Sequence, residues 1–101
     1  MATQPTILVS VLKTEPARQA ALIALLKQNI ETVIRRLDGW KAARLIAAQD
    51  GASVVIYSEW ETPAAVQAMR GDPRMVDYFP RIAELASLDS IMGSTVLSET
   101  R

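Results

Sequence analysis

The segment "WKAARLIAAQDGASVVIYSEW", residues 40–60, predicts a β-hairpin, and this hairpin decides the fold class of the chain. Both halves of the segment are apolar, and the second half is rich in β-branched residues, which is typical of strands. Asp50-Gly51 suits a tight turn because both residue types tolerate positive φ. We therefore expect strands over residues 40–48 and 52–60.

The register of this hairpin assigns its side chains to two faces, since paired residues share a face. A turn at Asp50-Gly51 places Leu45 opposite Ile56 and Lys41 opposite Trp60. One face then carries Ala43, Leu45, Ala47, Val54, Ile56, Ser58 and Trp60. The other face carries Trp40, Ala42, Arg44, Ile46, Val55, Tyr57 and Glu59. Both faces are thus substantially apolar.

The sequence before the hairpin predicts one strand and one helix. Residues 6–12 are short and β-branched, which indicates a strand. Thr14 is a candidate cap for a helix that ends before Gly39, a residue suited to the position just past a helix. The apolar face of this helix is marked by residues that recur at steps of four and three: Leu22, Leu26, Ile30, Val33 and Leu37.

The sequence after the hairpin predicts two helices and a last strand. Thr62-Pro63 opens a short helix to about Gly71, and Asp72-Pro73 opens another to about Ala86, each with a capping residue before proline. Pro80 lies inside the second helix and is expected to kink or split it. Residues 90–98 indicate a strand with a bend at Gly93.

The resulting order, β-α-β-β-α-β, predicts an α+β ferredoxin-like fold with a four-stranded antiparallel sheet, formed as one domain by residues 1–101. Helices cover one face of such a sheet. Burying the other face requires a second chain, so we expect a homodimer with the sheets face to face. The alternative is a monomer in which the outer face of the sheet is partly exposed to water and carries some apolar residues. The predicted interface residues are Trp40, Ile46, Val55 and Tyr57.

Composition excludes several kinds of site. Eleven basic and eleven acidic residues cancel without a basic block, which argues against nucleic acid as a partner. The chain has no Cys and no His, so a thiolate nucleophile, a Ser-His triad and an imidazole-ligated zinc or haem are unavailable. No phosphate loop or dinucleotide fingerprint occurs, and we expect neither a cofactor nor a metal. The first residues carry no basic leader and a six-residue apolar run, which favours a cytoplasmic location without a membrane span.

Trp60 is the central candidate for a functional site. It shares a face with Ala43, Ala47 and Ser58, and small residues beside a large aromatic leave volume for a pocket. The alternative is that the small residues let a helix approach and Trp60 caps the core. The candidate substrate-binding residues, which equally suit a core, are Ile56, Ser58, Met69, Met75 and Phe79.

Tyr78 and Arg81 are the candidates for contact with an ionised substrate. They lie three residues apart, so they can share one helical face and present a hydroxyl and a fixed positive charge to a phenolate. A solvated helix face is the alternative for both residues. If the pocket forms, we expect Trp60, Tyr78 and Arg81 to carry the chemistry, because no imidazole is available.

Three segments together resemble one known family. "LDGWKAARLIAAQDGASVVIYSEWET", "SEWETPAA" and "AMRGDPRMVDYFPRIAEL" are similar in order and spacing to the antibiotic biosynthesis monooxygenase family, within the dimeric α+β barrel superfamily. The resemblance covers nearly the whole chain. It implies a cofactor-independent insertion of molecular oxygen into a phenolic or quinol-type aromatic molecule, with Trp60 lining the pocket.

The chain departs from this family pattern at several positions. Family members that oxygenate anthrones carry an Asn four residues before the Trp, where this chain has Ile56. Their helical Tyr has no match at Val66, Arg81 corresponds approximately to their pocket Arg, and the ligand His of the haem-degrading branch is missing. We interpret the chain as a monooxygenase of this type. The alternative is a non-catalytic small-ligand-binding or structural protein of the same fold.

Overall fold

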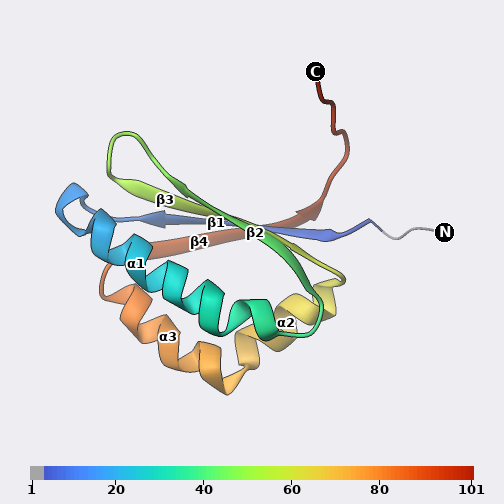
Figure 1. The fold of residues 1–101 in the computed structure, drawn as a ribbon, viewed down its shortest axis with the longest axis horizontal. Coiled ribbons are helices and arrows are strands. Elements are labelled where there is room, and N and C mark those ends of the chain that lie inside the picture. Colours follow the sequence, from blue (N-terminus) through green and yellow to red (C-terminus); the bar gives the residue numbers. More distant parts are fainter. Residues whose placement is uncertain (1–3) are drawn as a thin grey trace.

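The computed structural model describes residues 4–101 as one antiparallel sheet covered on one face by helices (Figure 1). The strands are β1 (Thr6–Lys13), β2 (Trp40–Ala47), β3 (Ser53–Trp60) and β4 (Ser87–Ser94), in the spatial order β2-β3-β1-β4. The helices are α1 (Pro16–Thr32), the 3-10 turn η1 (Ile34–Arg36), α2 (Pro63–Gly71) and α3 (Pro73–Ala83). This arrangement confirms the ferredoxin-like α+β fold.

The predicted hairpin register is confirmed near the turn and wrong at the far end. Leu45 pairs with Ile56, whereas Trp60 pairs with Trp40 and not with Lys41. A β-bulge between Trp40 and Ala42 makes Lys41 an extra residue, which shifts the alternation of faces by one position. Trp40 therefore packs with Trp60 against the helix-facing core and not on the outer face. Its indole Nε1 is buried and has no hydrogen-bond partner among residues 4–101.

The first helix begins and ends differently from the prediction. Its N-cap is Glu15, and the Thr14 hydroxyl donates instead to the Leu85 carbonyl at 2.6 Å. This bond ties the start of α1 to the chain just after α3. The regular helix stops at Thr32, and η1 carries the chain on towards Gly39. The predicted apolar face is confirmed: Leu22, Leu26 and Val33 are buried, and Ile30 and Leu37 are partly buried.

The end of the chain shows two further differences. Pro80 lies within α3 without splitting it. Proline removes a bond to the carbonyl four residues earlier, and Val76 at that position is half exposed, so water can replace the lost donor. β4 starts at Ser87 rather than residue 90 because it pairs with β1 along its full length, from Lys13 to Thr6. Gly93 stays in this pairing, and the chain bends at Val96 instead.

Gly39→Ala is expected to lower the free energy of unfolding by about 2 kcal/mol or more. Gly39 has a φ of +85°, and an L side chain pays roughly 1–2 kcal/mol in that left-handed region. An added Cβ would also lie 2.6 Å from the Ala65 Cβ, which forces the start of α2 to shift. Denaturant titration followed by circular dichroism measures the change.

Gly71→Ala is the matched control for this substitution. Gly71 is the last residue of α2, has no positive φ, and an added Cβ there has no atom within 4 Å. Alanine favours a helix by up to about 1 kcal/mol over glycine, so this variant should be as stable as the parent protein or more so. Equal losses in the two variants would contradict the steric explanation of Gly39.

Candidate functional site

A cavity of about 210 Å³ lies between the sheet and the helices. All four strands, η1 and the three α-helices contribute to its mostly apolar lining. It lies where two clusters of the core meet, one around Trp60 and Met75 and the other around Leu26 and Ile82. Trp60 is only 1% exposed and lines the cavity as well, so it belongs to the core and to the pocket wall together.

The five predicted substrate-binding residues all line this cavity. Ile56 and Ser58 come from β3, Met69 from α2, and Met75 and Phe79 from α3. Alternation along β3 brings Ile56, Ser58 and Trp60 to the same face, because side chains two apart point the same way. The lining therefore combines the apolar side chains of Ile56 and Trp60 on the sheet side with methionines on the helix side, which adapt to shape.

Hydrogen bonds already occupy the polar atoms of the Trp60 wall. The Trp60 Nε1 donates to Ser58 Oγ at 3.0 Å, and Ser58 Oγ donates to the Leu8 carbonyl at 3.1 Å. This chain of bonds holds the indole against β3 and leaves its N–H unavailable to a ligand. Trp60 can therefore offer a ligand an apolar surface but not a hydrogen-bond donor.

Tyr78 and Arg81 lie together but outside the cavity lining. The Arg81 guanidinium stands 4.9 Å from the centre of the Tyr78 ring, a cation–π distance. Arg81 is exposed, and the Tyr78 hydroxyl lies 3.5 Å from the Thr32 Oγ1. Both residues are on α3, so the predicted shared helical face is present. The structure does not bring that face to the cavity.

Four polar lining residues were not identified by the sequence analysis: Ser10, Asn29, Arg70 and Ser90. A signal for Asn29 was present, because it falls three residues after Leu26 on the apolar stripe of α1, where a polar residue is unexpected. Arg70 gave no signal in the sequence. It is exposed and also lines the cavity, which places its side chain at the opening.

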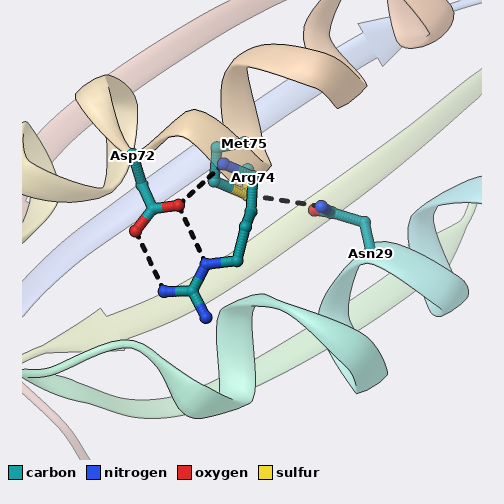
Figure 2. Close-up of polar contacts among 4 residues, drawn as sticks. All are labelled: Asn29, Asp72, Arg74 and Met75. Carbon is teal, nitrogen blue, oxygen red and sulfur yellow. Dashed lines mark hydrogen bonds and ion pairs between the residues drawn. The ribbon is translucent and has the colours of Figure 1, made fainter.

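The start of α3, which carries Met75 into the cavity, is held by a capping interaction (Figure 2). The Asp72 Oδ1 accepts from the Arg74 backbone N–H at 2.8 Å, and both carboxylate oxygens accept from the Arg74 guanidinium at 3.0 Å. These hydrogen bonds, above all those from the guanidinium, lower the pKa of Asp72. The capped turn is therefore most stable when Asp72 is ionised.

The stability of the protein is expected to depend on this ionisation. Because the folded-state pKa of Asp72 is lowered, its contribution is fully present above the ordinary aspartate pKa of about 3.9 and is lost as the pH falls through the lowered value. Asp72→Asn should thus melt below the parent protein at neutral pH, with a difference that narrows in strong acid. Arg74→Ala should show the same trend in thermal denaturation. A difference that stays constant with pH would contradict the assignment.

Two further observations concern residues 4–101. No group of three or more Asp or Glu side chains is arranged to hold a metal ion in this part of the chain. None of the helices described there has both the length and the apolar character needed to cross a membrane.

Comparison with known proteins gives matches in sequence and in structure. A family model described as antibiotic biosynthesis monooxygenase matches residues 5–81. Tetracenomycin-F1 monooxygenase of Streptomyces glaucescens is 36% identical over 72 residues, which are 71% of this chain and 64% of that protein. The chain thus spans slightly less than two thirds of this relative. Rv0793 of Mycobacterium tuberculosis is 29% identical over 83 residues, 82% of this chain and 81% of that protein.

Solved structures share the fold at low sequence identity. The monooxygenase ActVA-Orf6 of Streptomyces coelicolor, in complex with nanaomycin D, has a TM-score of 0.86 and 23% identity, with 97% of this chain and 93% of that chain covered. SnoaB of Streptomyces nogalater, described as a cofactor-independent oxygenase, has a TM-score of 0.79 and 14% identity, with 95% and 97% covered. At these identities the likeness establishes the fold.

Proposed function

Because the chain belongs to the antibiotic biosynthesis monooxygenase family, we propose that it is a cofactor-independent monooxygenase acting on a phenolic or quinol-type aromatic molecule. The observation that carries this proposal is the mostly apolar cavity walled by the buried Trp60. Support also comes from SnoaB, described as a cofactor-independent oxygenase, and from ActVA-Orf6, whose structure contains nanaomycin D.

The proposed reaction draws all its electrons from the substrate. Loss of a proton converts the phenol into an electron-rich anion, which passes an electron to molecular oxygen within the cavity. The two radicals combine into a peroxide at the ring carbon, and loss of water leaves a quinone. One oxygen atom enters the product and the other leaves as water, so the two substrate hydrogens balance the equation and no added reductant is needed.

The protein's contribution would be to bind the substrate and favour its anion. Met69, Met75 and Phe79 line the helix side of the cavity, and Trp60 lines the sheet side. An electrostatic contact is worth more in such a low-dielectric site than in water, which favours ionisation of the phenol. The assignment of Tyr78 and Arg81 to this contact stays a prediction. Arg70, which lines the opening, is the alternative cation.

Oxygen uptake tests the proposed function. Purified protein is given 1-naphthol or an anthrone, neither of which can form a quinone without gaining an oxygen atom, with no added metal or flavin. Oxygen is followed with an electrode while the quinone is quantified. We expect uptake above the protein-free autoxidation rate, with one oxygen consumed for each quinone formed. An uptake that never exceeds autoxidation across the panel would eliminate the oxygenase.

A non-catalytic ligand-binding protein is the second candidate, and one observation favours it. Ile56 lines the cavity at the position where the family's anthrone oxygenases carry an Asn, so the sheet side lacks that amide. Binding of the same aromatic compounds without oxygen uptake would select this candidate. Both candidates use the same cavity and differ in whether the bound molecule reacts.

We also propose that the protein is a homodimer formed through the outer face of the sheet. The helices leave this face uncovered (Figure 1). Strand pairing aligns Tyr57 with Val9 and Val9 with Ile91, so these three residues share a face. Ile91 is 72% exposed. Ile46 is 49% exposed in the same region. A second copy would bury these residues together with Val55, whereas Trp40 takes no part because it faces the helices.

Val55→Asp is expected to give monomers or aggregates, since an unpaired carboxylate is costly to bury in an apolar interface. Light scattering at micromolar concentration measures the mass of the particle. Ala64→Asp is the matched control, because Ala64 is exposed on α2, on the helix side of the molecule, and this variant should keep the parent mass. A parent protein that is itself a compact monomer would rule out the dimer.

A further inference from the structure

Most polar groups of the cavity already have good hydrogen-bond partners. Ser58 and Trp60 are bonded to each other, and Ser58 also donates to the Leu8 carbonyl. Ser10 and Ser90 are bonded to each other through their hydroxyls at 2.9 Å. These groups would have to break or share a bond to hold a ligand, which reduces the gain from each new contact.

Asn29 is different, because its amide is deeply buried and poorly paired. The side chain comes from α1, lines the cavity, and Asn29 is 2% exposed. Its one hydrogen bond within residues 4–101 runs from Nδ2 to the Met75 Sδ at 3.2 Å (Figure 2). A thioether is a weak acceptor, whereas an amide offers two donors and two acceptor lone pairs. The remaining donor and acceptor capacity of this amide is not used by any side-chain hydrogen bond within residues 4–101.

We infer that Asn29 is the hydrogen-bonding anchor for the oxygen substituent of an aromatic ligand, an inference that rests on the proposed function. The amide can hold that oxygen in both protonation states. Its Oδ1 can accept from a neutral phenol, and the Nδ2 hydrogen not given to Met75 can donate to a phenolate. Asn29 thereby supplies from α1 an amide to a cavity whose sheet side carries Ile56.

This anchor selects the ligand by its hydroxyl rather than by its rings. A dry cavity of about 150 Å³ holds benzene, so the volume of about 210 Å³ has room for the second ring of naphthalene. The lining recognises the rings through apolar contact, which naphthalene and 1-naphthol share. The Asn29 amide adds a contact that 1-naphthol alone can make. Comparing the Kd values of these two ligands therefore isolates the contribution of the Asn29 amide to binding.

Equilibrium dialysis of the parent protein and of Asn29→Leu with both ligands tests the inference. Leucine has nearly the shape of asparagine and suits an apolar site, so the variant should fold. We expect Asn29→Leu to raise the Kd for 1-naphthol about tenfold, which corresponds to about 1.4 kcal/mol. The Kd for naphthalene should stay unchanged or fall. The matched control Gln28→Leu, at an exposed amide one residue earlier on α1, should change neither value.

Met75→Leu provides a second measurement that does not remove Asn29. It deletes the thioether acceptor and leaves the amide free. Because Met75 also lines the cavity, its contact with the rings is measured with naphthalene, and the ratio of the 1-naphthol Kd to the naphthalene Kd should stay the same or fall. Equal weakening of both ligands by Asn29→Leu would make Asn29 a structural residue and overturn the inference, as would an unchanged Kd for 1-naphthol. Tenfold weaker naphthol binding in a protein that shows no oxygen uptake would support the anchor and overturn only the oxygenase.

Discussion

Trp60→Ala is expected to lower the free energy of unfolding by about 3–5 kcal/mol, the usual cost of removing a buried tryptophan. Trp60 is 1% exposed and packs in a cluster with Leu8, Val33 and Val66, so its loss enlarges the existing cavity and removes contacts from β1, the junction of α1 and η1, and α2. A small domain has a total stability of only about 5–15 kcal/mol, so this loss is a large fraction of it. Denaturant unfolding followed by circular dichroism measures the change.

Trp60→Phe separates packing from binding. Phenylalanine keeps an aromatic wall but loses the Nε1 donor to Ser58, so we expect a smaller loss of stability and weaker ligand binding. In the proposed oxygenase, KM should rise more than kcat falls, because the indole N–H is already bonded to Ser58 and takes no part in the transition state. A loss confined to kcat would show that Trp60 acts on the reacting atoms.

Arg70→Ala is expected to reduce turnover of a phenolic substrate about ten- to a hundredfold if Arg70 contacts the developing anion. Losing one hydrogen bond between charged groups costs about 1.5–3 kcal/mol. Arg70 lines the cavity at its opening, whereas Arg81 is exposed on α3 and stacks on Tyr78 outside the lining. Steady-state oxygen uptake at saturating substrate measures the change in kcat.

Arg81→Ala is the direct comparison for this prediction. It removes the same charge from the neighbouring helix and the contact with Tyr78. If Arg70 is the residue that contacts the anion, turnover of Arg81→Ala should remain close to that of the parent protein. A large loss in Arg81→Ala with an unchanged Arg70→Ala would select Arg81, the residue assigned from the sequence, over Arg70. It would also mean that α3 turns its Tyr78 face towards the cavity when a substrate binds.

The residues on regular strands were the most predictable part of the site. Along β3 the side chains alternate strictly, so one correct pair, Leu45 with Ile56, was enough to bring Ile56, Ser58 and Trp60 to one face. The capped starts of α2 and α3 at Thr62 and Asp72 were equally readable, because a capping side chain followed by proline is a local signal. Their caps are confirmed as predicted.

The positions hardest to predict were those where one extra residue or one helical turn changes the direction of a side chain. Because of the bulge at Lys41, Trp40 packs against the core and not on the predicted outer face. No local sequence pattern predicts this bulge. Tyr78 and Arg81 share a helical face as predicted, but the packing of α3 decides which face meets the cavity. Met75 and Phe79 occupy that side of α3 instead.

By itself the sequence determined the order of the elements, the hairpin, the family resemblance and the absence of thiol and imidazole chemistry, because these depend on local patterns and composition. Only the tertiary structure decided that a cavity remains beside Trp60, and that Asn29 and Arg70 line it while Arg81 does not. A cavity is the volume that several elements fail to fill together. Its existence depends on how α1, α3 and the sheet pack, and residues distant in sequence meet only there.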